Sequence, residues 1–167
     1  MYQQYDITQS KNFALSSDVL EAIEQEKHNY EDTRAVAIEA LKIVQQKYGW
    51  VPDSAINAIA KLLGITSSDV EGIATFYSHI FRQPVGRHVI LYCDSVVCYI
   101  TGYKMILAKL EQCLNIKSGQ TTSDRRFTLL PTCCLGNCDK GPTLMVDNDT
   151  HILLTPNKIG ALLDQYL

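Results

Sequence analysis

The sequence predicts an α+β protein in which a helical bundle domain precedes a domain that mixes strands and helices. Before Pro84, apolar residues recur at every third or fourth position, which is the period of amphipathic helices. After Gly86, short runs rich in β-branched residues replace this pattern and predict strands. Proline and glycine interrupt both patterns, so we place the domain boundary there. The prediction is therefore a helical domain at 15–84 and an α/β domain at 86–167.

The N-terminal residues 1–14 are polar, and we expect them to be mobile. They contain neither a basic segment followed by an apolar run, as in a secretory signal, nor the arginine-rich amphipathic pattern of mitochondrial targeting. The first helix should then open with a capping box formed by Asp18 and Glu21, because paired side chains three residues apart can bind the free N–H groups of a helix start.

Two further helices are expected in the middle of this domain. One should begin at Asp32 or Thr33 and end at Gly49, since glycine readily takes the left-handed conformation that closes a helix. The next should be capped by Asp53 and end at Gly64. Their inward faces are predicted from the helical spacing of the apolar residues: Ala37, Leu41, Val44 and Tyr48 in the first, and Ile56, Ile59, Ala60 and Leu63 in the second.

A fourth helix should be capped by Ser68 together with Glu71. Its apolar residues form one stripe at helical spacing: Val70, Ile73, Ala74, Tyr77, Ile80 and Phe81. Most of this stripe should pack inside its own domain. Phe76 lies off the stripe and Phe81 at its edge, so we expect the fourth helix to leave some apolar surface for a partner.

In the second domain, His88–Tyr92 is a β-branched-rich run that predicts a strand ending at Cys93. Ile100–Leu114 should be a helix, because apolar residues repeat along it at helical spacing. Phe127–Leu130 predicts a second strand, which leads into Cys134. Both cysteine loops would then follow strand ends, which is the edge where α/β sheets usually hold ligands.

The C-terminal part should contain a β-hairpin and a closing helix. The arms of the hairpin are expected at Thr143–Val146 and Ile152–Leu154, on either side of the turn-forming segment DNDTH. The closing helix is predicted from the spacing of its apolar residues: Ile159, Leu162, Leu163 and Tyr166. The resulting order is β-α-β-β-β-α.

Cysteine spacing gives the chemistry of this domain. Two pairs stand out, in the patterns C-x4-C and C-x3-C: Cys93 with Cys98, and Cys134 with Cys138. A 2Fe–2S cluster needs four thiolates, two for each iron, and these pairs supply them. Gly136 and Gly141 can let the second loop curve around the sulfur atoms and offer backbone N–H donors.

Other sites fit this spacing less well. Structural zinc usually takes C-x2-C pairs or paired histidines, and the four histidines show no such pairing: His28, His79, His88 and His151. Zinc and plain thiols nevertheless remain open alternatives at this point. A dithiol oxidoreductase would need C-x-x-C, which the sequence lacks.

Four segments of the chain form a recognisable combination: YGWVP, VEGIATFYSHIFRQPVG, CDSVVC and LPTCCLGNCDKGP. Together they resemble the 24-kDa-type subunit family of NADH:quinone oxidoreductase, designated E in bacteria. The resemblance runs from about Ser17 to the C-terminus. It implies a small helical domain followed by a thioredoxin-like 2Fe–2S ferredoxin domain, and it assigns one 2Fe–2S cluster to four ligands: Cys93, Cys98, Cys134 and Cys138.

Two cysteines remain outside this assignment. Cys133 competes with Cys134, because a Cys133-x4-Cys138 pair would match the spacing of the first pair. Neighbouring side chains of an extended segment point to opposite sides, so both cannot easily reach one cluster. The family pattern Cys-Leu-Gly-x-Cys aligns with Cys134. Cys113 lies in a helical run, and we expect it to be a buried apolar residue.

The resemblance also implies an assembly. Members of the family lie against the flavin-bearing, NADH-binding subunit, which is designated F, in a complex on the cytoplasmic side of the inner membrane. The sequence agrees, since it has no G-x-G-x-x-G motif, P-loop or G-x-S-x-G motif, and no apolar stretch of about 18 residues. The net charge of −3 disfavours nucleic acid as a partner. We expect an electron-carrying subunit of a respiratory oxidoreductase, without a complete active site of its own.

Two alternatives stay open. The first keeps the chemistry and changes the assembly, because related 2Fe–2S subunits occur in NAD-linked hydrogenases and formate dehydrogenases. The second is a zinc-binding adaptor without redox activity. A ferric–thiolate cluster colours a protein reddish brown, whereas zinc leaves it colourless, so a visible spectrum separates the second alternative from the first.

Overall fold

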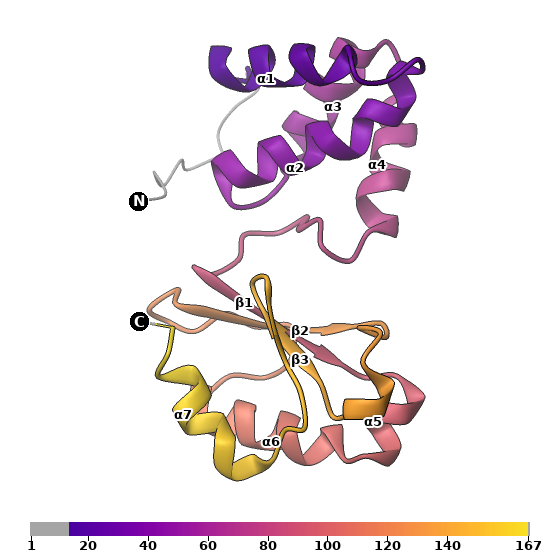
Figure 1. Cartoon of the computed structure of the whole chain (residues 1–167). Coiled ribbons are helices and arrows are strands. Elements are labelled where there is room, and N and C mark those ends of the chain that lie inside the picture. Colours follow the sequence, from indigo (N-terminus) through magenta and orange to yellow (C-terminus); the bar gives the residue numbers. More distant parts are fainter. Residues whose placement is uncertain (1–13, 167) are drawn as a thin grey trace. The chain divides into compact units, whose positions relative to one another are not determined.

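The computed structural model describes residues 14–166 (Figure 1). The expected mobility of the N-terminal segment concerns residues that, except for Ala14, lie outside this range. The chain separates into two compact units, with the division between Pro84 and Val85. The first unit is helical and the second combines a sheet with helices, so the predicted α+β class is confirmed.

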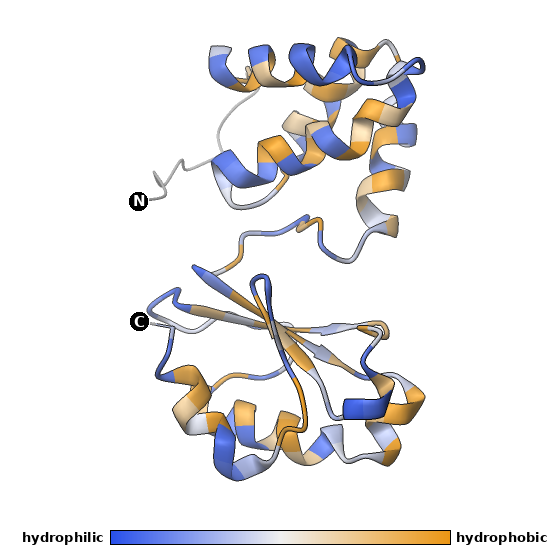
Figure 2. Ribbon diagram, in the orientation of Figure 1, coloured by the Kyte–Doolittle hydropathy of each residue, from blue (hydrophilic) through white to orange (hydrophobic). Residues whose placement is uncertain are grey.

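The described residues of the helical unit form four α-helices and a short 3-10 helix: α1 (Ser17–Lys27), η2 (Thr33–Val36), α2 (Ala37–Tyr48), α3 (Asp53–Leu63) and α4 (Ser67–Phe76). Figure 2 shows hydrophobic and hydrophilic residues alternating along each of them, as in amphipathic helices. Their apolar faces meet in one core, in which Ile23, Leu41, Ile59 and Val70 are fully buried.

The predicted helix ends in this unit are confirmed where glycine sets them. Gly49, with φ of 82°, ends α2, and Gly64, with φ of 68°, ends α3. Asp32 also acts as predicted, since its carboxylate accepts a hydrogen bond of 2.8 Å from the backbone N–H of Arg34 at the start of η2, which continues into α2. Such helix-end signals depend only on residues that are close together in the sequence, so they can be recognised from the sequence alone.

The capping box predicted for the first helix is wrong. The helix begins at Ser17, with Ser16 at the N-cap position and no side-chain cap bond to the described helix. Asp18 lies in the first turn and forms an ion pair of 2.7 Å with Lys47 of α2. The hydrogen bond from this ammonium group lowers the pKa of the Asp18 carboxyl to about 2. The Asp18 carboxylate thus binds Lys47 of another helix, and not the free N–H groups at the start of its own helix, as the local pattern had predicted.

The start of the third helix also differs from the prediction, by one residue. Pro52 occupies the N-cap position and Asp53 is the first helical residue. Its carboxylate pairs with Arg82 at 2.6 Å instead of capping the helix. A negative side chain in the first turn still complements the positive end of the helix dipole.

The cap of α4 is displaced as well. Thr66, not Ser68, is the N-cap residue, and its hydroxyl accepts a hydrogen bond of 3.1 Å from the backbone N–H of Asp69. The Thr66 hydroxyl in turn donates to the Asp69 carboxylate at 2.7 Å. This is a capping box moved two residues upstream, with aspartate in place of the predicted Glu71.

The predicted stripe extends beyond the end of α4. The helix stops at Phe76, so Tyr77, Ile80 and Phe81 belong to the segment that follows it. Hydrogen bonds from Gln45 hold this segment against α2. The Gln45 side chain donates to the His79 carbonyl at 2.7 Å and accepts from the Phe81 backbone N–H at 2.6 Å. These tertiary bonds, which the helical period does not reveal, replace a further helical turn.

The second unit has a four-stranded sheet, made of β1 (His88–Cys93), β2 (Phe127–Thr132), β3 (Leu144–Val146) and β4 (Asp149–His151). The strand order is β2-β1-β3-β4. β1 runs parallel to β2 and antiparallel to β3, which pairs with β4 as a hairpin. The helical elements are α5 (Val96–Ile100), α6 (Tyr103–Leu114), η3 (Cys138–Lys140), η4 (Pro156–Lys158) and α7 (Ile159–Leu163). In Figure 1, α6 and α7 lie on one side of the sheet, and they enclose a core containing Ile90, Leu110 and Ile159.

Two expected elements of this unit require correction. The single helix expected over Ile100–Leu114 is divided by Gly102, whose φ of 100° separates α5 from α6. The second arm of the hairpin is Asp149–His151 and not Ile152–Leu154. Its polar residues pair with β3 at an edge of the sheet, where one side meets water, so an apolar run was the wrong signal for this strand.

Among residues 14–166, no helix has the length and apolar character required to cross a bilayer.

Candidate metal centre

The sheet brings both cysteine segments to one edge. Cys93 is the last residue of β1, and its register partner in the parallel strand β2 is Thr132, which is the last residue of that strand. Cys134 follows two residues later, and Cys138 opens η3. Cys98 lies in α5, a helix and not the loop expected from the sequence. Parallel neighbouring strands thus deliver the two predicted cysteine pairs to the same end of the sheet.

The two pairs differ in their exposure to water. Cys93 and Cys98 are buried, at 1% and 2% exposure. Cys134 and Cys138 are exposed. All six cysteines of the chain lie within the described residues, and all are free thiols. A group bound by these four sulfur atoms would have one side inside the domain and the other at its surface.

The buried pair is held by hydrogen bonds. The Ser95 hydroxyl lies 3.2 Å from Cys93 Sγ. Burial opposes ionisation of Cys93, but hydrogen bonds from the side chain and backbone of Ser95 and from the Cys98 thiol lower the pKa of Cys93 overall. Burial and the hydrogen bond with Cys93 raise the pKa of Cys98. Within the pair, the pKa of Cys93 therefore lies below the usual value of a thiol and that of Cys98 above it.

The exposed pair repeats this arrangement. Cys134 Sγ and Cys138 Sγ are 3.2 Å apart. The backbone N–H of Gly136 donates to Cys134 Sγ at 3.4 Å and is the main cause of the lowered pKa of Cys134. The hydrogen bond with Cys134 raises the pKa of Cys138. Gly136 adopts φ of 81°, a left-handed conformation that glycine takes without strain, so the expected curvature of this loop is present.

Ser95 connects the two pairs. Its hydroxyl hydrogen bonds to Cys134 as well as to Cys93, so it lies between the buried and the exposed sulfur atoms. The backbone of Leu135, in the second loop, also hydrogen bonds to Cys93. Sequence reasoning did not identify Ser95. Its only signal was a hydroxyl two residues after the first cysteine, which equally fits a helix start.

Gly141 fits closely against the first pair. A Cβ atom at this position would lie 2.8 Å from Thr101 Oγ1 and 3.6 Å from Cys98 Sγ. A larger residue would therefore push against α5 and its cysteine. The expectation that Gly141 lets the second loop curve is therefore wrong, because its φ of −67° is open to any residue. The position favours glycine because α5 approaches it closely.

The donor set fits a 2Fe–2S cluster. Four thiols stand in two pairs, and backbone groups of Gly136, Leu135 and Thr143 hydrogen bond to three of them, as expected around the negative charge of such a cluster. Within residues 14–166, no three His, Cys, Asp or Glu side chains gather around a point that could hold a single metal ion. A binuclear cluster requires only a pair of thiolates at each iron.

The remaining cysteines lie outside the two pairs. Cys133 is exposed beside Cys134. Cys113 is exposed on α6, so its interpretation as a buried apolar residue is wrong. Its helical position was predicted, but the period alone did not separate the inward face of α6 from its edge.

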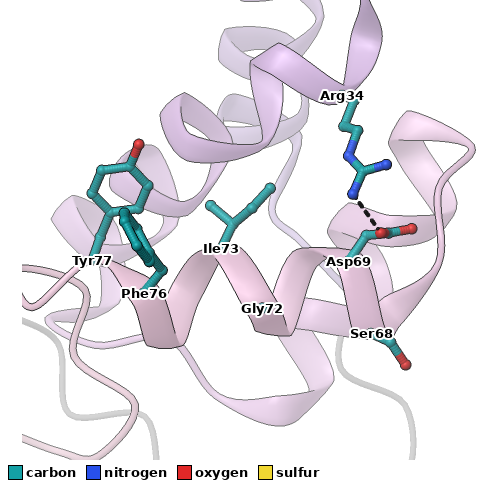
Figure 3. Close-up of a pocket in the computed structure, with 7 residues that line it drawn as sticks. All are labelled: Arg34, Ser68, Asp69, Gly72, Ile73, Phe76 and Tyr77. Carbon is teal, nitrogen blue, oxygen red and sulfur yellow. Dashed lines mark hydrogen bonds and ion pairs between the residues drawn. The ribbon is translucent and has the colours of Figure 1, made fainter.

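The helical unit carries a shallow hollow of about 390 Å³ along α4. Figure 3 shows Phe76 and Tyr77 at one end, Ile73 in the middle, and an ion pair between Arg34 and Asp69 at the other end. Phe76 is 80% exposed, and its ring packs edge-on against that of Tyr77, with the ring centres 5.1 Å apart. The exposed apolar surface expected on the fourth helix is thus present.

Comparison with known proteins gives two kinds of match. The family model for thioredoxin-like [2Fe-2S] ferredoxin matches residues 23–167. The chain is 70% identical over 158 residues to the E-type subunit of NADH-quinone oxidoreductase from Salmonella typhimurium, with 95% of each chain covered. It is 69% identical to the E-type subunit from Escherichia coli K12, again with 95% of each covered. It is 57% identical over 164 residues to that of Pseudomonas aeruginosa, covering 98% of this chain and 99% of the relative.

A solved structure of an NAD+-reducing [NiFe]-hydrogenase, in the air-oxidized state, matches with a TM-score of 0.59. The match covers 89% of this chain and 22% of the hydrogenase chain, at 22% sequence identity. At this identity the likeness concerns the fold. It indicates that the arrangement of helices and strands described above also occurs as part of a longer chain.

Proposed function

Because the chain belongs to the thioredoxin-like [2Fe-2S] ferredoxin family, and within it to the E-type subunits of NADH-quinone oxidoreductases, we propose that it carries electrons in such a complex through one 2Fe–2S cluster. The proposed ligands are the two cysteine pairs: Cys93, Cys98, Cys134 and Cys138. The complex as a whole is an oxidoreductase, and this chain contributes an electron-carrying site to it.

The observation that carries the proposal is the meeting of two distant cysteine pairs around Ser95. Its hydroxyl hydrogen bonds to Cys93 of the first pair and to Cys134 of the second. When bound, a 2Fe–2S cluster supplies one-electron chemistry. The chain's own residues hold its sulfur ligands, bury one side of the site and leave the other side accessible to a partner.

Backbone groups have a defined task in this proposal. The Gly136 N–H that donates to Cys134 Sγ, and the Leu135 and Thr143 backbone bonds to the buried pair, offset negative charge on the sulfur atoms. Donors of this kind favour the more negative, reduced state of an iron–sulfur site. Exposed carboxylates at Asp94 and Asp139 act in the opposite direction.

We infer that the partner is the flavin-bearing, NADH-binding subunit that is designated F. No dinucleotide or P-loop motif occurs in the sequence, so hydride chemistry must take place on another chain. The chain would reach the cytoplasmic side of the inner membrane through the complex. The hydrogenase alternative has a fold-level likeness in its favour, whereas the sequence relatives described above, at 57–70% identity, are all named as E-type subunits.

The test is to purify the full chain anaerobically, measure iron and sulfide, and record visible and EPR spectra before and after reduction. We expect about two irons and two sulfides per chain, a reddish-brown colour and an EPR signal on reduction. Adding the flavin-bearing subunit and NADH should then reduce the cluster. A colourless protein that contains zinc instead would refute the proposal, and so would an iron–sulfur protein that NADH and the flavin-bearing subunit leave oxidised.

A further inference from the structure

Ser95 occupies the start of α5 without acting as a helix cap. It is the N-cap residue of this helix, with φ of −70° and ψ of 167°, and it lies two residues after Cys93. A serine at this position normally accepts a hydrogen bond from a backbone N–H of the first helical turn. Within the described residues, the Ser95 hydroxyl makes no such capping bond. Its place in the helix therefore does not explain why a hydroxyl stands here.

Other N-cap residues of the chain show what decides between capping and another partner. Thr66 caps α4, since its hydroxyl accepts a hydrogen bond of 3.1 Å from the Asp69 backbone N–H. Ser16 makes no cap bond to α1, and its side chain hydrogen bonds to the Asp18 carboxylate instead. A charged acceptor thus draws a hydroxyl away from a helix start, because hydrogen bonds to charged groups are stronger than those between neutral groups. A thiolate beside Ser95 would have the same effect on its hydroxyl.

The Ser95 hydroxyl lies between one sulfur of each cysteine pair. It is 3.2 Å from Cys93 Sγ, and it also hydrogen bonds to Cys134. A hydroxyl can either donate its proton or accept one from a partner. Cysteine binds a metal as a thiolate, so a ligand sulfur has no proton to give. Once both sulfur atoms are ligands, the Ser95 hydroxyl can therefore only donate to them.

The other groups that hydrogen bond to these sulfur atoms differ from the Ser95 hydroxyl in kind. Gly136, Leu135 and Thr143 act through their backbones, which a side-chain substitution leaves in place. The backbone of Ser95 also hydrogen bonds to Cys93, but its hydroxyl is a side-chain group. A single substitution at Ser95 can thus remove the hydroxyl proton while the main-chain donors of the site remain.

The direction of the effect follows from charge. Reduction of a 2Fe–2S site adds one electron, and thus one negative charge, to the thiolate-bound irons. A donated hydrogen bond becomes stronger as its acceptor becomes more negative, so it stabilises the reduced state more than the oxidised state. Ser95 is half-buried, where water competes less for such a bond. A hydroxyl at this position should therefore raise the reduction potential of the site.

We propose that Ser95 is a positioning residue that acts through Cys93 and Cys134, and that its hydroxyl raises the reduction potential of the cluster by donating to their sulfur atoms. This inference rests on the proposed function and adds the side chain that adjusts the electron carrier. In the step concerned, the reduced flavin of the partner loses one electron, and one ferric iron of the cluster becomes ferrous. The hydroxyl proton stays on Ser95, and no covalent bond forms or breaks.

The test compares four variants of the full chain, purified anaerobically. Ser95→Ala and Ser95→Gly both remove the hydroxyl, but glycine is tolerated at an N-cap position far better than alanine, so the pair separates a role at the sulfur atoms from a role in starting α5. Ser95→Thr keeps the hydroxyl. Ser118→Ala is the control, because this half-buried hydroxyl of the same unit lies 2.8 Å from the Tyr92 hydroxyl and not beside a cysteine. Iron content is measured first, and the reduction potential is then determined by a redox titration followed by EPR.

We expect normal iron content in all four variants. In Ser95→Ala and Ser95→Gly the equilibrium constant for reduction should fall about tenfold, which lowers the potential of a one-electron couple by about 59 mV. Ser95→Thr and Ser118→Ala should keep the wild-type potential.

Three results would overturn this inference while leaving the proposed function intact. They are an unchanged potential in Ser95→Ala and Ser95→Gly, a lowered potential in Ser95→Ala alone, which would assign the hydroxyl to the start of α5, and a loss of iron from both, which would assign it to cluster assembly. A wild-type chain that holds no cluster would instead refute the proposed function.

Discussion

At the scale of single residues, the choice between Cys133 and Cys134 depends on what each sulfur can reach. Cys134 receives the Gly136 N–H, lies 3.2 Å from Cys138 and hydrogen bonds to Ser95. Cys133 precedes it in a chain that has just left β2, where neighbouring side chains point in opposite directions. The contacts of Cys134 are those expected of a ligand.

We therefore predict that Cys134→Ser loses most of the cluster iron, because one iron is left without a thiolate, whereas Cys133→Ser retains it. Cys113→Ser is the matched control, since this thiol is also exposed, and it should leave the reduced-state EPR signal unchanged. Iron analysis and EPR of anaerobically purified protein measure the effect. Equal loss of iron in Cys133→Ser and Cys134→Ser would refute the assignment.

The sequence predicted these four residues but not their environment. Spacing and motif pointed to the two pairs because ligand chemistry is local in the sequence. The alignment of β1 with β2 is a tertiary feature that the linear sequence does not contain. It determines that Cys98 is buried, that Cys134 is exposed and that Ser95 lies between the two pairs. The misplacement of Cys113 has the same origin, because the helical period fixes a face only to within a fraction of a turn.

At the scale of elements, some helix ends were predicted correctly from local sequence and others were not. Gly49 and Gly64 end α2 and α3 as predicted, because a left-handed cap is a property of the residue itself. N-terminal caps were misassigned where an acidic side chain forms an ion pair with a residue far away in the sequence, as Asp18 does with Lys47. Strand β4 was missed because its residues are polar and its pairing with β3 comes from the hairpin.

The start of the sheet gives a prediction at this scale. A Cβ atom on Gly86 would lie 2.9 Å from the Arg125 carbonyl oxygen and 3.0 Å from the backbone carbon of Phe127. Both are main-chain atoms that cannot move aside, so Gly86→Ala should lower the free energy of unfolding of the second unit by about 1–3 kcal/mol, the usual cost of overpacking. Chemical denaturation followed by circular dichroism measures this change.

Gly160→Ala is the matched control for that experiment. Gly160 lies in α7 of the same unit, and a Cβ atom there would meet nothing within 4 Å. Alanine favours a helix interior over glycine, so this variant should gain about 0.5–1 kcal/mol. A Gly86→Ala protein as stable as the wild type would show that β1 can shift away from β2 at little cost.

At the scale of the whole molecule, the proposed site lies entirely within the second unit. A metal site contributes its binding free energy to folding, and here it would join the cysteine of β1 to the loop after β2. Removing the cluster should therefore raise amide hydrogen exchange mainly after Gly86, while α1–α4 keep their protection. Equal loosening in both halves would contradict the division into domains at 15–84 and 86–167, which remains a prediction.

The helical unit has no proposed ligand, yet it carries the hollow along α4 (Figure 3), and this suggests a role in assembly. An 80% exposed Phe76, supported edge-on by Tyr77, is the kind of aromatic anchor that dominates protein interfaces. We predict that Phe76→Asp weakens co-purification with the flavin-bearing subunit at least tenfold while the cluster spectrum stays normal. Tyr30→Asp is the control, because this ring is also exposed, at 38%, but lies outside the hollow. If Phe76→Asp co-purifies as well as the wild type, the exposed Phe76 and Tyr77 rings at the end of α4 do not take part in docking, and this prediction is wrong.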